Sequence, residues 1–322
     1  MIIGDLRRRY VYEPVVESEC MGRVLVTGGH GFLGREIVGV LRARGDEVAD
    51  PARAQLDIAL PQSWESILPV DSVVHCAAFV PIGRQSPDDL PAMVRASVLG
   101  TECALAWAKD HGVKRFVYIS SADLYDRATP MPQSGYCEDA PVAWSDVSNY
   151  YPLGKLLGEQ LCRHSHETGK LETVSLRLSQ VHGRGMRPRG VVAAFAERAR
   201  KGESLSVHAP EHTGDFLYVR DAVQGVVRAI DAGSPGPLYN IGSGKESSLR
   251  DLASAVWSAF RSDPPRVELG NQEGTRFVLD IARAQRELNY VPQFSLEQGL
   301  KDWAAAMRAD ATAPPIREQQ SE

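Results

Sequence analysis

Apolar runs without internal alternation recur along the chain, and segments with a helical repeat of apolar positions separate them. Such runs are typical of parallel strands covered on both faces, and a repeat of three or four residues indicates a helix packed on them. Strands are expected near 23–27, 46–50, 71–75, 115–120 and 173–177. Helices are expected near 32–44, 91–110, 151–168, 191–201, 220–231 and 249–260. The alternation predicts an α/β fold, a doubly wound parallel sheet with a smaller C-terminal lobe.

The first expected strand runs directly into a glycine-rich turn and then into a helix. Gly28, Gly31 and Gly34 follow the strand at a spacing of three. The first glycine permits a tight turn, the second lets the backbone approach a pyrophosphate, and the third lets the helix pack on the strand. The amides and the positive dipole end of the helix, which begins at Phe32 and Leu33, would face the phosphates. We assign these five residues to dinucleotide binding in a Rossmann-type sheet; the alternative is a glycine turn without a ligand.

A tyrosine and a lysine, Tyr151 and Lys155, lie one helical turn apart. Free tyrosine has a pKa of about 10 and is a poor base at neutral pH, but a nearby ammonium favours the phenolate and lowers that pKa. Tyr151 could then take a proton from a substrate hydroxyl as a hydride passes to a nicotinamide, or return it in the reverse direction. The alternatives are an exposed helix pair, or Tyr150 as the acting phenol, although Tyr150 has no lysine four residues later.

A pair of serines, Ser120 and Ser121, follows the strand expected at 115–119. A hydroxyl at the end of a central strand could hydrogen-bond the reacting oxygen and orient it toward Tyr151. Taken alone, two serines after a strand are more typical of a turn.

These segments together resemble the extended short-chain dehydrogenases/reductases of the NAD-dependent nucleotide-sugar epimerase/dehydratase family. The resemblance spans about residues 23–307. Its motifs in chain order are TGGHGFLG (27–34), HCAA (75–78), GT (100–101), SSADLY (120–125), YPLGK (151–155), LRLSQVHG (176–183), DFLYVRD (215–221) and YNIGSG (239–244). It implies that Ser121 is the catalytic hydroxyl beside Tyr151 and Lys155. It also implies that the nicotinamide ribose lies along Cys76, Ala77 and Ala78.

The resemblance gives the chain its expected division. We expect an N-terminal arm (1–21), a dinucleotide-binding domain (22–180), a mainly substrate-binding lobe (181–310) with segments that return to the first domain, and a tail (311–322). In relatives, the helices near 91–110 and 151–168 pair with a second subunit, which implies a homodimer. Apolar side chains that allow such pairing, and that could equally be core, are Leu105, Ala106, Leu156, Leu157 and Leu161.

Several positions depart from the family pattern. Gly214 and Gly270 stand where relatives carry arginines that bind the substrate pyrophosphate, and a glutamine replaces the asparagine of N-V-Y-G. These losses put the usual nucleotide-diphosphate contacts in doubt. Arginines in a nearby loop could replace the missing cations, or they could form a solvated basic loop. The candidate substrate-binding residues are therefore Gln180, Arg184, Arg187 and Arg189.

Asp123 occupies a position that varies with the reaction among relatives. Relatives that epimerise next to a ketone carry Cys there, and relatives that eliminate water carry Glu. A carboxylate at Asp123 could remove the acidic proton beside a transient 4-ketone. Ala122 replaces the aspartate of the sugar dehydratases, which argues against a standard 4,6-dehydratase. The alternative is a loop carboxylate that caps backbone amides.

The expected cofactor is NAD or NADP. Asp50 follows the second strand, where an acid can select NAD, but it lies early in the expected register. Counted against reductase relatives, Arg53 takes the 2′-phosphate position, and Asp57 and Ile58 would flank the adenine. This comparison favours NADP slightly.

Composition agrees with a soluble cytoplasmic enzyme. The 322 residues are 43% hydrophobic and 24% charged, with a net charge of −5, so nothing suggests nucleic-acid or membrane binding. No run approaches the length of a membrane helix. The five cysteines are scattered, which indicates reduced thiols without metal-ligand spacing. In the arm, Arg7, Arg8 and Arg9 precede no apolar signal core, so secretion is not expected.

The sequence therefore predicts a nucleotide-sugar epimerase that acts through a transient 4-keto sugar. One alternative is an NADPH-dependent nucleotide-sugar 4-ketoreductase that uses the same residues in one direction. Another, suggested by the missing arginines, is an oxidoreductase for a small non-nucleotide alcohol or ketone. A non-catalytic dinucleotide sensor is a fourth possibility, against which Ser121, Tyr151 and Lys155 argue because a sensor does not need them.

Overall fold

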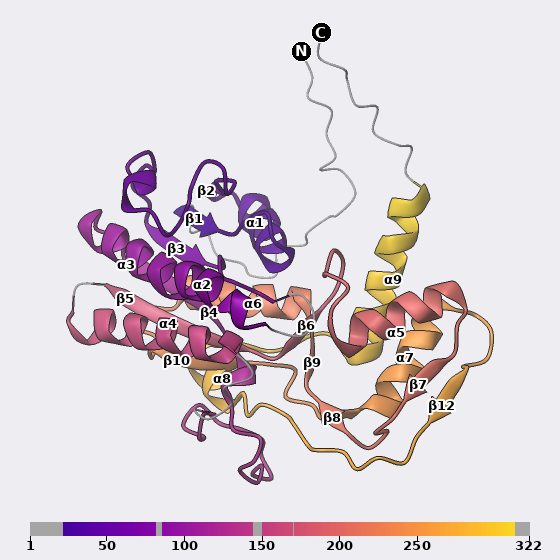
Figure 1. Ribbon diagram of the computed structural model, residues 1–322. Helices are drawn as coiled ribbons and strands as arrows, with labels where there is room; N and C mark the ends of the chain where they lie inside the picture. The colour runs from indigo at the N-terminus through magenta and orange to yellow at the C-terminus, as the bar shows by residue number, and fades with distance from the viewer. Residues whose placement is uncertain (1–21, 82–85, 144–149, 170, 313–322) are drawn as a thin grey trace.

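The computed structural model describes residues 22–81, 86–143, 150–169 and 171–312, and a parallel six-stranded sheet lies at its centre (Figure 1). The strands in sheet order are β2 (Glu47–Ala49), β1 (Arg23–Thr27), β3 (Ser72–His75), β4 (Arg115–Ser121), β5 (Glu172–Leu178) and β10 (Leu238–Ile241). All neighbouring strands in this sheet run parallel. The expected Rossmann-type fold is confirmed. The expected arm and residues 313–322 of the expected tail lie outside the described residues.

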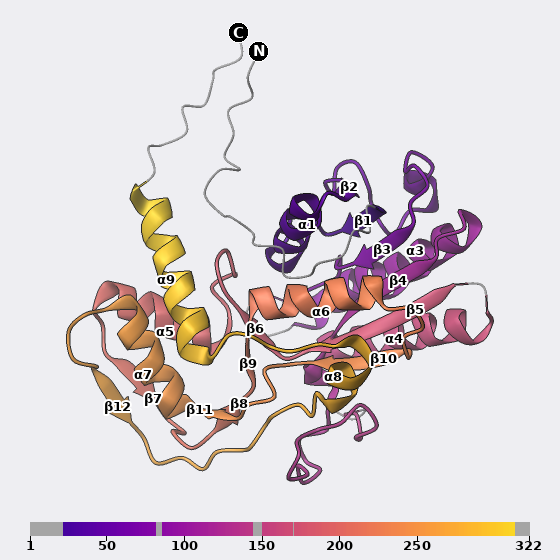
Figure 2. The same cartoon turned by 180° about the vertical axis from the view of Figure 1, so that it is seen from behind.

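Helices cover both faces of the sheet. Helices α1 (Phe32–Arg44) and α6 (Val219–Asp231) pack together on one face, and α3 (Gly100–Asp110) and α4 (Tyr150–Glu167) pack together on the other, as Figure 2 shows from behind. Helix α8 (Ala282–Leu288) lies against α6 and β10. Segments late in the chain, namely α6, β10 and α8, therefore complete the central sheet and one of its helical layers. Among the described residues, no helix combines the length and apolar character needed to cross a bilayer.

The connections reverse direction between β1 and β3. The chain passes from β1 outward to β2, whereas β3 continues toward β4 on the opposite side. The carboxyl ends of β1 and β3 stay side by side, because Thr27 pairs with His75 in the register. The Nδ1 atom of buried His75 lies 2.9 Å from Oγ1 of Thr27 and links the two ends. Open α/β sheets bind ligands at such a point, outside the carboxyl edge.

A second lobe has its own core (Figure 2). It packs α5 (Gly190–Lys201), α7 (Leu249–Phe260) and α9 (Leu296–Thr312) around buried Trp257 and Leu300. Its short strand pairs are β6 (Gln180–His182) with β9 (Phe216–Tyr218), β7 (Leu205–Val207) with β12 (Val267–Leu269), and β8 (Thr213–Gly214) with β11 (Ser247–Ser248). This lobe lies beyond the carboxyl edge of the main sheet and faces the loops that leave it.

Two buried carboxylates join these late segments to the rest. Asp215 accepts hydrogen bonds from the amide and the hydroxyl of Ser243, both at 2.7 Å. Asp221 accepts from the amides of Gln293 at 2.8 Å and Phe294 at 3.0 Å. Burial raises the pKa of both carboxyls, that of Asp221 to about 6. The two aspartates of the DFLYVRD motif therefore hold the backbone of later segments in place by accepting hydrogen bonds from its amides.

The helix expected over 91–110 is interrupted. It consists of α2 (Leu90–Met93), a π-helical stretch (Val94–Leu99) and α3. Within the stretch, the hydroxyl of buried Ser97 accepts a hydrogen bond from the amide of Phe79 at 3.2 Å. A π-helical insertion carries no signature in apolar periodicity, so the sequence pattern predicted one continuous helix.

Candidate active site

The glycine turn after β1 leaves no room for larger residues. Gly28 has a φ of +69°, and the amide of Gly31 donates to its carbonyl at 2.9 Å. A Cβ atom on Gly34 would lie 2.1 Å from the Gly28 carbonyl oxygen, and one on Gly28 would lie 2.8 Å from the Ala77 amide nitrogen. Glycine is therefore required for a tight turn and for close packing against the loop after β3.

The start of α1 is electropositive. No side chain caps the helix and no acidic residue lies in its first turn, so the amides of Phe32, Leu33 and Gly34 add to the positive end of the helix dipole. Arg35 follows in the same turn, and its Nε donates to the Gly31 carbonyl at 3.2 Å. An uncapped helix start behind a glycine turn suits a pyrophosphate, so these residues fit a dinucleotide.

The loop after β3 lies directly beside this turn. The amide of Cys76 donates to the Thr27 carbonyl at 3.1 Å, and the amide of Ala77 donates to the Thr27 hydroxyl at 3.3 Å. Burial raises the pKa of the Cys76 thiol to about 12, so the thiol stays uncharged. Cys76, Ala77 and Ala78 thus offer a small, neutral surface at the switch point of the sheet.

Asp50 directly follows β2, which ends at residue 49, and lies against the glycine turn. A Cβ on Gly29 would lie 2.7 Å from Cβ of Asp50, and Nε2 of His30 lies 3.0 Å from the Asp50 carbonyl oxygen. The Asp50 carboxylate is paired with Arg42 at 2.5 Å. Its charge is therefore partly balanced.

The three other residues expected near the adenosine lie in the following segment. Arg53 is exposed in a turn. Asp57 forms an ion pair with Arg95 at 2.6 Å, and the hydrogen bond from Arg95 lowers the pKa of Asp57, with a smaller effect from the charge of Arg53. Ile58 packs closely against Gly100, because a Cβ on Gly100 would lie 2.6 Å from Cδ1 of Ile58. Arg53 and Asp57 thus share one neighbourhood, whereas Ile58 contacts the start of α3.

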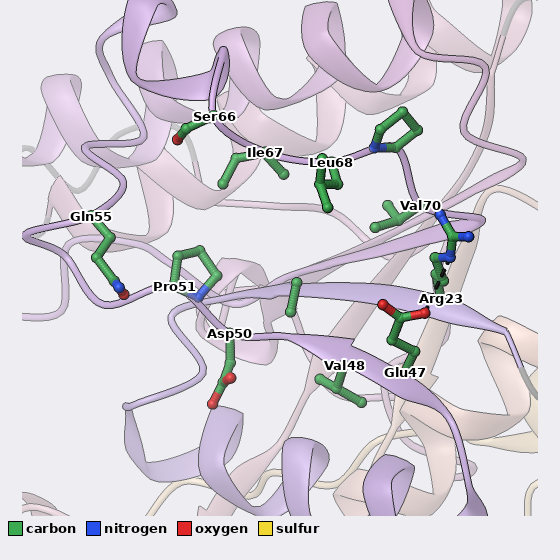
Figure 3. Close-up of a pocket in the computed structure, with 12 residues that line it drawn as sticks. Arg23, Glu47, Val48, Asp50, Pro51, Gln55, Ser66, Ile67, Leu68 and Val70 are labelled. Carbon is green, nitrogen blue, oxygen red and sulfur yellow. Dashed lines mark ion pairs between the residues drawn. The ribbon is translucent and has the colours of Figure 1, made fainter.

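A cavity of about 430 Å³ lies beside the edge strand β2 and not at the catalytic candidates (Figure 3). Arg23 and Glu47 border one end, and Asp50 and Gln55 border the other. The segment 66–70 lies across from the strand. Only the Asp50 end adjoins the glycine turn, so the cavity does not contain the reacting centre.

The expected catalytic residues converge from β4 and α4. Ser121 ends β4, and its side chain forms a hydrogen bond with Tyr151 in the first turn of α4. Lys155 is buried one turn later, and its Nζ donates to the Ile119 carbonyl at 2.6 Å. Burial lowers the pKa of Lys155 to about 8. A phenol, a hydroxyl and an ammonium are thus placed together at the carboxyl edge of the sheet.

The electrostatics of Tyr151 differ from the expectation. Burial and, to a smaller extent, the charge of Asp123 raise its pKa to about 12, against the opposing effects of the Ser121 hydrogen bond and the charge of Arg189. Lys155 does not depress this pKa as expected, because its ammonium is directed to the Ile119 carbonyl. In this state Tyr151 is a protonated phenol, ready to donate a proton.

Asp123 lies next to the phenol and has its own partner. It belongs to a short 3₁₀ turn (Ala122–Leu124), in which its amide donates to the Ser121 hydroxyl at 3.1 Å. Its side chain is 43% exposed and lies 3.5 Å from Arg127. The carboxylate is accessible and its charge acts on Tyr151, whereas the side chain that caps this turn is the Ser121 hydroxyl.

The four candidate substrate residues are distributed unevenly. Gln180 is half-buried at the start of β6, and its amide donates to the Asp215 carbonyl at 3.1 Å. Arg184 is half-buried and Arg187 is exposed in the loop 183–190. Arg189 reaches the catalytic candidates, with its Cζ 5.7 Å from the centre of the Tyr151 ring.

The two glycines that stand where the resemblance implies arginines differ in burial, since Gly214 is buried and Gly270 is exposed. A Cβ on Gly214 would lie 2.9 Å from the Phe216 ring, and one on Gly270 would lie 2.5 Å from the His208 carbonyl oxygen. Neither position can hold an arginine without rearrangement.

Comparison with known proteins identifies the group of enzymes that share this arrangement. A family profile described as "NAD dependent epimerase/dehydratase family" matches residues 24–242. The chain belongs to this family. Relatives include sugar epimerases, dehydratases and reductases, so the chain is an enzyme of the short-chain dehydrogenase/reductase type.

Two relatives and one solved structure indicate the range of this similarity. UDP-glucose 4-epimerase from Mycolicibacterium smegmatis is 29% identical over 311 residues, which cover 86% of this chain and 96% of the relative. 2-Alkyl-3-oxoalkanoate reductase from Stenotrophomonas maltophilia is 28% identical over 337 residues, which cover 89% of this chain and 100% of the relative. The crystal structure of UDP-glucose 4-epimerase with UDP-glucose from Thermotoga maritima has a TM-score of 0.77 at 24% identity, covering 90% of this chain and 99% of that chain. The last likeness concerns the fold alone.

In this family member, the sequence interpretation missed a buried polar network behind the site. Glu159 lies one turn after Lys155 and accepts from the Ser120 hydroxyl at 2.5 Å. It also forms a buried ion pair with Arg177 of β5 at 2.8 Å. The spacing of Tyr151, Lys155 and Glu159, each four residues apart, could have indicated a shared helix face. The network fixes α4 against β4 and β5, and so fixes the position of the catalytic candidates.

Proposed function

We propose that this chain is an NAD(P)-dependent nucleotide-sugar epimerase that acts through a transient 4-keto sugar. The observation that carries the proposal is the Ser121–Tyr151 hydrogen bond at the carboxyl edge of β4, with Lys155 buried one turn away. The naming of the M. smegmatis relative as a UDP-glucose 4-epimerase supports the substrate class.

The dinucleotide would be held by the glycine turn, the start of α1 and the loop after β3. When bound, the nicotinamide accepts a hydride and returns it. Two features favour NADP slightly: Arg53 is exposed near the end of β2, and the Asp50 carboxylate is balanced by Arg42, which weakens its repulsion of a 2′-phosphate. Arg53, Asp57 and Ile58 remain the proposed adenosine neighbours.

The chain's own residues supply positioning and proton transfer. Ser121 orients the substrate hydroxyl toward Tyr151, which takes its proton in the oxidative half-reaction and returns it in the reductive one. Lys155 donates to the Ile119 carbonyl and holds α4 against β4, so ionisation of Tyr151 would rely on the positive charge of a bound oxidised nicotinamide. Asp123 is proposed to move the proton on a carbon beside the 4-ketone, since its carboxylate is accessible and close to Tyr151.

The first test is mass spectrometry of the small molecules released when freshly purified protein is denatured. A retained stoichiometric dinucleotide is expected, because an epimerase recycles its cofactor within one turnover. Its mass distinguishes NAD from NADP and so tests the role of Arg53. A protein that is empty after purification and binds NADPH reversibly would contradict the epimerase and favour a net reductase.

Two observations support a reductase as the second candidate. Tyr151 is a protonated phenol in this state, which suits proton donation to a ketone. Gly214 and Gly270 carry no charge at the two positions where the resemblance implies cations for a nucleotide diphosphate. The S. maltophilia relative, named as a 2-alkyl-3-oxoalkanoate reductase, represents this chemistry on a non-nucleotide substrate. Stoichiometric NADPH consumption with a ketone would favour this candidate, whereas isomerisation without net redox change would favour the epimerase.

We also propose a second copy of the chain as a partner. Of the residues expected at such an interface, Leu105 and Leu156 are 5% and 3% exposed and belong to the core, so they cannot pair with a second subunit. Leu157 is 38% exposed. Other exposed apolar side chains on α4 and the neighbouring helix are Leu90, Val94, Leu99 and Leu153. Light scattering is expected to give twice the monomer mass, and Leu157→Arg is expected to lower it.

A further inference from the structure

Arg189 is a cation placed against the catalytic phenol from the second lobe. It directly precedes α5, is half-buried, and holds its Cζ 5.7 Å from the centre of the Tyr151 ring. Among the residues that the structure describes, no carboxylate forms an ion pair with its guanidinium. A half-buried guanidinium without a counter-ion is costly unless a ligand supplies one.

Among the residues that the structure describes, the charges near Tyr151 do not cancel. Asp123 and Arg127 form one pair at 3.5 Å, which leaves Arg189 as an additional positive charge beside the phenol. Elsewhere in the second lobe arginines are matched, since Arg250 and Arg276 lie 2.6 Å and 2.5 Å from Glu211 and Glu246. The local excess therefore favours an anionic group on the bound molecule, at the reacting end.

The positions where family members place cations for a remote diphosphate are closed here. Side chains at Gly214 and Gly270 would overlap the Phe216 ring and the His208 backbone. Arg189 is instead next to the residue that handles the reacting oxygen.

We propose that Arg189 binds a carboxylate that the substrate carries two carbon–carbon bonds from the reacting carbon, so that the reacting group is a 3-hydroxy or 3-oxo carboxylate. This inference rests on the proposed function, because it assigns the substrate class of the Tyr151 site. Two such bonds separate the carbons by about 2.5 Å. A carboxylate at that separation stays beside the Tyr151 ring while Ser121 and Tyr151 hold the hydroxyl, and a planar guanidinium can bind it through two parallel hydrogen bonds.

The same chemical unit occurs in two kinds of molecule. In a hexuronate ring, C4, which carries the hydroxyl, is two carbon–carbon bonds from the C6 carboxylate. In an open-chain 3-hydroxy acid, C3 is likewise two carbon–carbon bonds from the C1 carboxylate. The experiment compares each acid with a neutral partner: UDP-glucuronate with UDP-glucose, and 3-hydroxydecanoate with its methyl ester. The full-length protein is assayed for epimerisation of the sugars and for NAD(P)-linked oxidation of the open-chain pair.

The decisive variant is Arg189→Gln. It is expected to lower kcat/KM for the preferred carboxylate substrate by about 10- to 100-fold, mainly through KM, and to change that for its neutral partner by less than about threefold. Arg189→Lys keeps the charge and is expected to recover part of the loss. Arg200→Gln removes a charge from the far end of α5, where Arg200 pairs with Glu197, and is expected to leave all rates unchanged. Thermal unfolding checks that each variant is folded.

Three results would overturn the inference. An equal loss on acid and neutral substrates, with a shifted pH profile, would make Arg189 a positioning residue for the charge state of Tyr151. Preference of the unmodified protein for UDP-glucose or the ester would refute the carboxylate while leaving the proposed function intact. No turnover of any of the four compounds by protein that binds the dinucleotide would refute both.

Discussion

The two sides of the candidate active site are built in opposite ways. The glycine-turn side (residues 28–34 and 76–78) is made of backbone packed so closely that single methyl groups do not fit at Gly28 or Gly34. The second-lobe side (residues 183–190) presents long side chains, of which Arg189 reaches the Tyr151 ring. The first side suits a ligand that many enzymes share, whereas the second allows the substrate to change while the fold is kept.

The largest effect is expected from a change at Tyr151, which lies between the two sides. Tyr151→Phe removes the exchangeable proton and leaves the ring, so kcat/KM is expected to fall by about 10³-fold while dinucleotide affinity stays unchanged. Initial rates and a dinucleotide titration measure the two quantities. Tyr150→Phe is the matched control, and its activity should remain close to that of the unmodified protein. Full activity of Tyr151→Phe would refute the proposed chemistry.

A methyl group on the glycine-turn side should damage binding and stability together. In Gly34→Ala the new Cβ would lie 2.1 Å from the Gly28 carbonyl oxygen, so the turn must open. We expect a loss of about 3 kcal/mol in the free energy of unfolding and weaker dinucleotide binding. Gly233→Ala is the control, because no atom lies within 4 Å of its added Cβ. Denaturant unfolding that shows equal stability for the two variants would contradict the described packing.

The free energy of unfolding should depend on pH through Asp221, which accepts hydrogen bonds from the amides of Gln293 and Phe294. Its pKa is raised to about 6 in the folded protein, so the folded state binds more protons than the unfolded state between the ordinary aspartate pKa and that value. Its stabilising contribution is present below about pH 4 and is lost as the pH rises through 6. Relative to Asp221→Asn, the unmodified protein should lose about 2 kcal/mol of unfolding free energy between pH 4 and pH 7.5. Parallel urea-unfolding profiles for the two proteins would show that the carboxyl does not titrate in this range.

A smaller effect is expected at the outer edge of the glycine-turn side. Arg53→Gln should reduce the preference for NADP over NAD by about tenfold, because an exposed arginine near a 2′-phosphate contributes little more than one charge-assisted hydrogen bond. Ratios of Kd for the two dinucleotides measure this preference. Arg23→Gln is the control, since Arg23 is an exposed arginine at the start of β1 and pairs with Glu47 at the start of β2. An unchanged ratio for Arg53→Gln would point to Asp50 as the selecting residue.

The sequence predicted the elements that depend on local patterns. Apolar runs and the glycine spacing identified the strands from β1 to β5 and the helices around them, because buried parallel strands and dinucleotide turns impose strict local constraints. The interruption at Val94–Leu99 was missed, since a π-helical stretch does not change apolar periodicity enough to be recognised.

The site was predicted less completely, because its electrostatics depend on contacts between distant segments. The sequence brought Tyr151 and Lys155 together but gave the wrong direction for the pKa of Tyr151, which burial and Asp123 dominate. Which of the loop arginines reaches Tyr151 depends on how the second lobe packs, and one-dimensional spacing contains no such information.

The late position of β10 has a consequence for the synthesis of the protein. Leu238–Ile241 pairs with β5, which ends at Leu178, so the edge of β5 stays open until the ribosome has made the intervening segment. At ordinary rates of translation this delay lasts on the order of several seconds. An uncovered parallel edge is a template for association with other chains, so nascent protein and fragments that end near residue 180 should depend on chaperones.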